Sequence, residues 1–345
     1  MGKSFNHLTR GYTLSMSIMP FLVVLACAIK SPLFIDGRFI INSILCLAGI
    51  LLVHMAVNLY DDIVDIEYLL NKGINFKDIC FSNKRKACAI LNGSYSLKEA
   101  KIILYIILFA AFLCGLYFVY LRGGLIILFM LLAILAGMFY PKSANYGLSE
   151  LTVGLVFGPL LVNSAYFAIT GYFNISIYYL SFAIGIMTTI LLITHSLMDY
   201  EDDKKKNKKT LPVMLDNKNL TINVISLLIL LSFAILYKEG SNMFRPQCAV
   251  FIPILLTLPV SVKLILSLYE YIQIKDVKFI PEWYFGRMEN WEEIKSNNME
   301  YFMFRFYLSR NLATIFNATL AIVCLLAFDC GFREIMYFKF DNFIF

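Results

Sequence analysis

The chain has 345 residues and a formal net charge of +6; 59% of its residues are hydrophobic and 16% are charged. Soluble domains carry about 25% charged residues, and a soluble fold of this length cannot bury so much apolar surface. The composition therefore excludes a soluble globular protein and indicates a chain whose solvent is largely lipid. Nucleic-acid binding is also disfavoured, because the basic residues are spread over separate short segments.

Apolar runs long enough to cross a bilayer recur along the chain. A hydrocarbon core of about 30 Å requires about 20 apolar residues in a helix. The first run follows a polar start and precedes no small-residue cleavage pattern, so we expect a signal anchor. Continuous apolarity without strict alternation excludes a barrel. We predict an all-α polytopic protein with about nine transmembrane helices: 12–30, 39–60, 101–120, 124–140, 149–170, 175–198, 220–237, 248–268 and 308–328.

The distribution of Lys and Arg predicts the orientation. With the N-terminus in the cytosol, most of the 30 basic residues fall in segments on the cytosolic side, as the positive-inside rule requires. We therefore expect a multi-pass protein of the cell (inner) membrane, in contact with membrane lipid. Its N-terminus and its two most polar segments, 61–99 and 199–219, would be cytosolic and its C-terminus outside.

The two polar segments follow the second and the sixth predicted helices, so the same feature recurs four helices apart. This repeat predicts two four-helix halves plus a ninth helix around a central cavity, in a single domain that covers 1–345. Repeats of this kind often place a site at their interface. A third cytosolic segment, 276–307, is polar and aromatic; it is either an interfacial helix lying on the membrane or a lid that excludes water.

The first polar segment begins with an acidic cluster at the end of the second helix. Residues spaced by three, four and seven positions share a helix face. Asn58, Asp61 or Asp62, and Asp65 therefore project together where this helix leaves the bilayer, with Glu67 following.

A second acidic cluster ends the sixth helix, where His195, Asp199 and Asp203 share a face. Carboxylates four positions apart repel each other, and acids near a helix C-terminus oppose its dipole. Two clusters that break both rules predict a compensating cation, and oxygen ligands without a Cys or His pattern fit Mg²⁺, with Mn²⁺ as a substitute. The alternative is that the acids are solvated and paired with the lysines of 204–209. For His195, a capping role competes with a substrate contact.

These motifs resemble those of the UbiA superfamily of intramembrane prenyltransferases, most nearly its 1,4-dihydroxy-2-naphthoate polyprenyltransferase branch of menaquinone biosynthesis. The first family motif, Asn-Asp-x-x-Asp, is matched by Asp62 and Asp65, with Asp61 in place of its Asn and Asn58 at a further Asn three positions earlier. The family has another acid after this motif, but no acid stands at the corresponding position of this chain; Glu67 and Asn71 are the candidates to replace it.

The second family motif, Asn-Asn-x-Arg-Asp-x-x-x-Asp followed by Gly-Lys-x-Thr-Leu, is matched at five positions: Asp199, Asp203, Lys208, Thr210 and Leu211. His195, Ser196 and Met198 replace its Asn-Asn and Arg, a departure that concerns the acceptor rather than the chemistry. Between the motifs, the Tyr146 to Glu150 stretch is similar to the branch's Gly-Leu-Gly-Asp/Glu region.

The resemblance implies Mg²⁺-dependent transfer of a prenyl chain from a polyprenyl diphosphate to an aromatic acceptor, with release of pyrophosphate. The branch implies a quinone precursor such as 1,4-dihydroxy-2-naphthoate. Four carboxylates would be catalytic and, together with Asp61, would hold the metal: Asp62, Asp65, Asp199 and Asp203. The expected substrate contacts are Asn58, Arg85, Lys208, Tyr146, His195 and Tyr200. Of these, Arg85 and Lys208 would contact the diphosphate, since each follows one cluster on the same side.

Two other functions stay open. A UbiA-type enzyme with a different acceptor, or one that cyclises the prenyl chain, would use the same acids. A transporter would use intramembrane acids as an ion path. The acids here lie at cytosolic helix ends beside a Lys-rich segment, which favours phosphate chemistry over transport.

Overall fold

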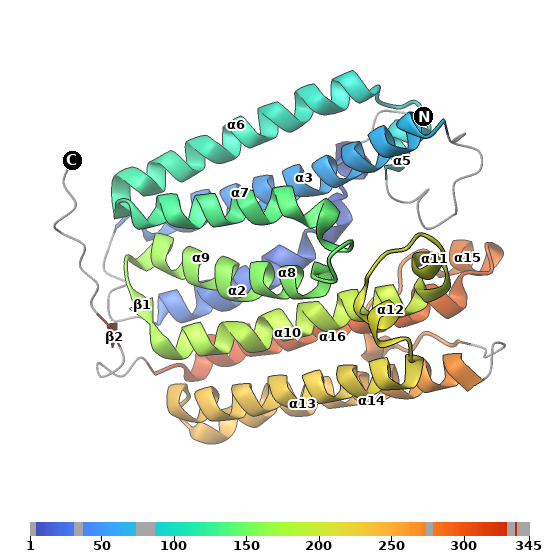
Figure 1. Cartoon of the computed structure of the whole chain (residues 1–345). Helices are drawn as coiled ribbons and strands as arrows, with labels where there is room; N and C mark the ends of the chain where they lie inside the picture. Colours follow the sequence, from blue (N-terminus) through green and yellow to red (C-terminus); the bar gives the residue numbers. More distant parts are fainter. Residues whose placement is uncertain (1–4, 31–36, 74–86, 274–278, 330–334, 337–345) are drawn as a thin grey trace. The chain divides into compact units, whose positions relative to one another are not determined.

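The computed structural model describes residues 5–30, 37–73, 87–273, 279–329 and 335–336. Most of these residues are helical (Figure 1). In this part of the chain the only strands are β1 (Phe173–Asn174) and β2 (Ile335–Met336), which form one antiparallel pair. Nine helical segments of the described chain are long and apolar enough to cross a membrane. The predicted all-α, multi-pass membrane fold is therefore confirmed.

The spanning segments match the nine predicted runs one to one. They are built from η1 (Gly11–Thr13) with α2 (Ser15–Ile29), α3 (Phe39–Asn71), α6 (Leu97–Arg122), α7 (Leu125–Ser143), the continuous α8 (Ser149–Leu155), η3 (Val156–Leu160) and α9 (Leu161–Thr170), α10 (Ile175–Met198), α13 (Lys218–Met243), η4 (Gln247–Val250) with α14 (Phe251–Gln273), and α16 (Glu300–Ala327). Short helices lie outside these spans: α1 (Phe5–Leu8), α5 (Cys88–Leu91), α11 (Tyr200–Lys205), α12 (Leu211–Leu215), η5 (Trp283–Phe285) and α15 (Trp291–Ser296).

The chain divides into two compact units that differ from the predicted four-helix halves. The described part of unit 1 lies within 5–18 and 37–141 and contains α3, α6 and α7. Unit 2 takes the described residues within 19–30 and 142–336, and so includes most of α2. That both units form a single domain around a central cavity remains a prediction.

Unit 1 is organised around α3, which packs along α6 (Figure 1). Leu59 and Ile63 of α3 are buried in one apolar cluster with Ala100 and Leu104 of α6. Helix α3 runs 11 residues past the predicted end at residue 60, because its acidic motif continues the helix instead of ending it. The acids are therefore held on a rigid helix rather than on a loop.

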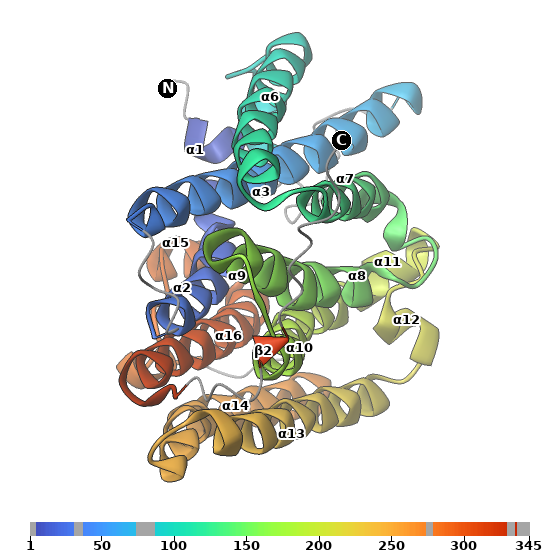
Figure 2. The same cartoon turned by 90° about the vertical axis from the view of Figure 1, so that its left-hand side faces the viewer.

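Unit 2 is organised around α10, which contacts α8, η3, α13 and α16, while α13 and α14 run side by side in both views (Figures 1 and 2). Glycines allow a close approach of α10 to the α8–η3 segment. A Cβ atom on Gly158 would lie 2.4 Å from the Ser181 carbonyl oxygen, and one on Gly185 would lie 2.3 Å from that of Gly154. This contact fixes α8 against α10, whose C-terminal end carries the second acidic cluster.

The described part of the polar aromatic segment, 279–299, packs on α16. Asn311 of α16 donates from Nδ2 to the Phe285 carbonyl oxygen at 2.8 Å, and Phe304 contacts Phe285 and Trp291. Residues 300–307 already belong to α16, and α15 is only six residues long. Side-chain contacts with α16 hold the described residues of 279–299 in a mostly irregular conformation. Whether the segment lies on the membrane or acts as a lid stays a prediction.

Candidate functional site

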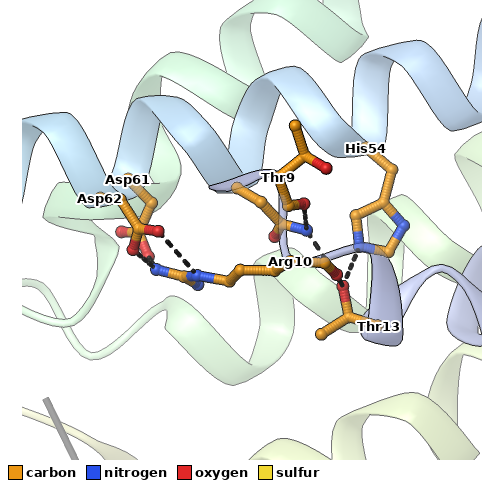
Figure 3. Close-up of polar contacts among 7 residues, drawn as sticks. Thr9, Arg10, Thr13, His54, Asp61 and Asp62 are labelled. Carbon is orange, nitrogen blue, oxygen red and sulfur yellow. Dashed lines mark hydrogen bonds and ion pairs between the residues drawn. The ribbon is translucent and has the colours of Figure 1, made fainter. Parts of the chain in front are cut away.

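The first acidic cluster is paired with an arginine from the N-terminal segment. Arg10 lies between α1 and η1, with φ of 50° and 7% of its surface exposed. Its Nη2 donates to Asp61 Oδ2 at 3.0 Å and its Nε to Asp62 Oδ2 at 3.3 Å. The Nη2 group also contacts Asp62 Oδ1 (Figure 3). Asp61 and Asp62 are themselves only 6% and 1% exposed.

This pairing explains how two adjacent carboxylates stay buried. Burial by itself would lower the pKa of Arg10, but the carboxylates of Asp61 and Asp62 outweigh it and raise that pKa well above its usual value. The guanidinium is thus fully charged. Arg10 thus supplies a cation to these two acids from the protein itself, and the Mg²⁺ expected from the sequence would be held in addition.

A chain of polar side chains holds the N-terminal segment along α3. Asn58 Nδ2 donates to Thr13 Oγ1 at 3.0 Å. Thr13 Oγ1 also lies 3.2 Å from His54 Nε2 (Figure 3). On the other side of the ring, His54 Nδ1 lies 2.7 Å from Ser17 Oγ. The predicted substrate contact Asn58 thus helps to place Arg10.

The remaining acids of the first cluster lie farther along α3. Asp65 is exposed, one turn beyond Asp61. Glu67 forms an ion pair with Lys101 of α6, with 2.6 Å between Oε1 and Nζ. Asn71 is exposed at the end of the helix. Of the two candidates for the family's later acid, Glu67 is therefore engaged in a surface ion pair.

The second acidic cluster spans the junction of α10 and α11. Asp203 is 6% exposed and accepts a hydrogen bond from Thr210 Oγ1 at 3.4 Å. Lys208 Nζ lies 3.5 Å from Asp203 Oδ1, and the Lys208 amide donates to the Asp203 carbonyl oxygen. The structure thus brings together Asp203, Lys208 and Thr210, three residues of the second motif. The Lys208 ammonium lies beside the buried Asp203 carboxylate.

His195 is held between a carboxylate and two aromatic rings. Its Nδ1 lies 3.4 Å from Asp199 Oδ2. The edges of Phe302 and Phe306 of α16 lie against the imidazole, with ring centroids 5.4 and 5.7 Å away. The carboxylate and the aromatic rings together fix the orientation of this side chain.

Two acids at and after the second cluster form ion pairs with lysines, Glu201 with Lys218 and Asp216 with Lys204. The hydrogen bond from Lys218 lowers the pKa of Glu201, and the hydrogen bond from Lys204 lowers that of Asp216. The Tyr200 hydroxyl also donates to Asp216, at 2.5 Å. Tyr200, a predicted substrate contact, thus ties α11 to the end of α12, and its contact with substrate stays a prediction.

The substrate contacts predicted for Tyr146 and Arg85 stay predictions. The Tyr146 side chain is 64% exposed in the turn before α8. Arg85 lies outside the described residues.

Arg10 and Glu150 were not identified as site residues by the sequence analysis. A lone basic residue before the first transmembrane helix, such as Arg10, is also expected from the positive-inside rule, so its position does not indicate a site.

The carboxylates fit a magnesium ion that is shared with a substrate. No group of three or more Asp, Glu, His or Cys side chains among the described residues is close enough to form a complete metal site. Mg²⁺, however, is usually held by one or two carboxylates together with substrate phosphates. Each cluster offers that many carboxylates.

Comparisons with known proteins give a family and a fold. The UbiA prenyltransferase family model matches residues 17–267. No curated protein is significantly similar in sequence. Among solved structures, an apo UbiA homologue from Aeropyrum pernix K1 is 15% identical, with a TM-score of 0.57 and coverage of 86% of this chain and 94% of that chain.

Two further solved structures are similar in fold. A UbiA homologue from Archaeoglobus fulgidus bound to GPP and Mg²⁺ is 15% identical, with a TM-score of 0.51 over 93% of this chain and 98% of its own. A digeranylgeranylglyceryl phosphate synthase is 14% identical, with a TM-score of 0.54 over 93% and 97%. At these identities the likeness shows the fold alone.

Proposed function

The chain belongs to the UbiA prenyltransferase family, and from this premise we propose that it uses Mg²⁺ to transfer a prenyl chain from a polyprenyl diphosphate to an aromatic acceptor. The site would lie at the cytosolic face of the cell membrane. The observation that carries the proposal is the pairing of buried carboxylates with a cation in each cluster: Asp61 and Asp62 with Arg10, and Asp203 with Lys208. Family membership also favours an enzyme over a transporter.

The reaction breaks the C–O bond between the allylic carbon and the diphosphate, and the departing diphosphate takes up negative charge. When bound, Mg²⁺ neutralises part of that charge. Asp62, Asp65, Asp199 and Asp203 would hold the ion, with Asp61 in support. This assignment uses oxygen ligands only, as Mg²⁺ prefers.

The cationic side chains stabilise the same leaving group. Lys208 and Arg10 each hold hydrogen-bond donors next to a predicted metal carboxylate. A donor that is already fixed near the site can follow the developing charge without reorganisation. We therefore assign both to the diphosphate, Lys208 as predicted from the sequence and Arg10 in addition. Arg85 keeps its predicted diphosphate contact, although it lies outside the described residues.

The acceptor side of the site is assigned to His195. Its imidazole lies beside Asp199 and against Phe302 and Phe306, surroundings that suit a flat aromatic molecule with a hydroxyl group. This supports a quinone precursor such as 1,4-dihydroxy-2-naphthoate. A different acceptor, or cyclisation of the prenyl chain, is the second candidate because His195 replaces an Asn of the naphthoate branch.

The test is a product analysis of the purified protein in lipid nanodiscs. GPP and longer prenyl diphosphates are offered with aromatic acids, with 1,4-dihydroxy-2-naphthoate among them, in Mg²⁺ or in EDTA, and products are identified by mass spectrometry. We expect a prenylated aromatic product and pyrophosphate only with Mg²⁺, and loss of both in Asp203→Asn. Pyrophosphate release without any prenylated acceptor would favour cyclisation, and full activity in EDTA would remove the metal from the mechanism.

A further inference from the structure

One buried carboxylate in unit 2 has no part in the mechanism above. Glu150, in the first turn of α8, is 4% exposed. Its Oε1 accepts hydrogen bonds from Ser196 Oγ and from the backbone amide of Leu211, both at 3.1 Å. Its Oε2 accepts one from Ser149 Oγ at 2.7 Å. A charged acceptor that is buried this deeply is stable only when such donors surround it.

The two donors to Oε1 come from the segments on either side of the second acidic cluster. Ser196 lies in the last turn of α10, three residues before Asp199. Leu211 begins α12 and directly follows Thr210, which donates to Asp203. A single carboxylate oxygen therefore joins the C-terminal end of α10, next to Asp199, to residues 208–211. These residues, called the return segment below, contact Asp203 through Lys208 and Thr210.

The segment that carries Glu150 is itself firmly placed. The Lys209 amide donates to the Ala144 carbonyl oxygen at 2.7 Å, so the return segment also pairs with the turn before α8. Gly147 takes a φ of +73° in that turn, and a Cβ atom there would lie 3.2 Å from the Lys209 carbonyl oxygen. Thr189 of α10 donates to the Glu150 carbonyl oxygen at 3.3 Å. Residues 144–150 and residues 209–211 are therefore in close contact at several points.

We propose that Glu150 is a positioning residue that sets the geometry of Asp199, Asp203 and Lys208 for the metal and the diphosphate, an inference that rests on the proposed function. Its three hydrogen bonds leave it unsuited to ligate the metal, and its effect passes through Ser196 and Leu211. Partners of this kind hold ligating groups in place, and their loss typically weakens metal affinity or activity about 10- to 100-fold.

The first pair of variants separates hydrogen bonding from charge. Glu150→Gln keeps an oxygen for Ser196 and Leu211, and its new amide group can donate to the Ser149 hydroxyl. Glu150→Leu keeps the approximate volume but leaves those donors unpaired. We expect the half-saturating Mg²⁺ concentration of Glu150→Leu to rise at least about 10-fold and that of Glu150→Gln to stay within about 3-fold of wild type.

The second pair tests the same contact from the backbone. Leu211→Pro deletes the donor amide at the first position of a helix, where proline is tolerated, and the extended ψ of 155° at Thr210 suits a following proline. Leu211→Ala shortens the side chain but keeps the amide. The proline variant should show the rise in half-saturating Mg²⁺ and the alanine variant should not. Thr189→Val, which removes a contact to the Glu150 backbone, serves as a further control and should match wild type.

The measurements are the Mg²⁺ dependence of turnover, the KM for prenyl diphosphate, the melting temperature, and Mn²⁺ binding by electron paramagnetic resonance. A lower melting temperature with wild-type metal dependence in both Glu150→Leu and Leu211→Pro would reduce Glu150 to a structural role and overturn the proposal. Equal defects in Glu150→Gln and Glu150→Leu would also overturn it, because the charge itself would then be required. If Glu150→Leu does not fold, the comparison of Leu211→Pro with Leu211→Ala tests the positioning role instead.

The binding measurement separates this inference from the proposed function. If wild type binds Mn²⁺ but transfers no prenyl group, the proposed function fails, while weaker Mn²⁺ binding in Leu211→Pro than in Leu211→Ala still supports the positioning role. If wild type is active and the four variants share one metal affinity, the positioning role fails alone.

Discussion

Replacing Arg10 with methionine isolates the most unusual electrostatic feature of unit 1. Arg10→Met keeps much of the side-chain volume but removes the guanidinium that pairs with Asp61 and Asp62. Two adjacent carboxylates would then lie buried, at 6% and 1% exposure, without their cation. Removing one partner of a buried ion pair costs about 3–5 kcal/mol, because the other charge is left uncompensated. We expect a loss of stability in that range at low Mg²⁺.

The matched control breaks an exposed ion pair between α3 and α6 in the same unit. Lys101 and Glu67 are 2.6 Å apart, with side chains 43% and 42% exposed, and such pairs contribute about 0–1 kcal/mol. Lys101→Met should therefore lower the melting temperature of the protein far less than Arg10→Met. Asp62→Asn added to Arg10→Met should recover part of the loss, since it removes one of the two repelling charges.

Magnesium provides the decisive comparison. If the same carboxylates also hold a metal, added Mg²⁺ should raise the melting temperature of Arg10→Met more than that of Lys101→Met, because the ion binds the native state and replaces the missing cation. The assay is thermal unfolding in nanodiscs with and without Mg²⁺. Equal destabilisation by the two substitutions would refute the buried pair, and an Arg10→Met deficit that Mg²⁺ leaves unchanged would refute metal binding at these acids.

Three further predictions concern the proposed chemistry and topology. Turnover should cease in EDTA and return with Mg²⁺ or Mn²⁺, as measured by pyrophosphate release; activity that persists in chelator would contradict metal catalysis. Asp61→Asn should keep much of the activity, because its amide oxygen remains a ligand, whereas Asp203→Asn should lose at least about 100-fold in rate, or about 3 kcal/mol of barrier; equal losses would show that Asp61 is essential. A cysteine at Ser241 should react with an impermeant reagent added outside the cell and one at Lys206 should not; the reverse pattern would invert the topology.

The sequence alone determined the nine spanning helices and the site of the acidic clusters. A transmembrane helix requires about 20 apolar residues and hydrogen-bonds its own backbone, so composition within a short window predicts it. The acids at the end of α10, and the Lys and Thr that follow them, are close in sequence, and a helix followed by a short turn brings Asp203, Lys208 and Thr210 together. Local rules therefore sufficed for these features.

Only the tertiary structure decided the distant partners of Asp61, Asp62 and Glu150. Arg10 and Asp62 are 52 positions apart, and Glu150 and Leu211 are 61 apart. Arg10 belongs to no sequence motif, and the resemblance of the Tyr146 to Glu150 stretch to a family region does not reveal the partners of Glu150. A single charged residue near a membrane helix has the same sequence pattern whether it faces solvent or a buried partner. Their roles depend on how α1, α3, α8 and α10 pack within each unit, because burial is what makes a carboxylate require a specific donor.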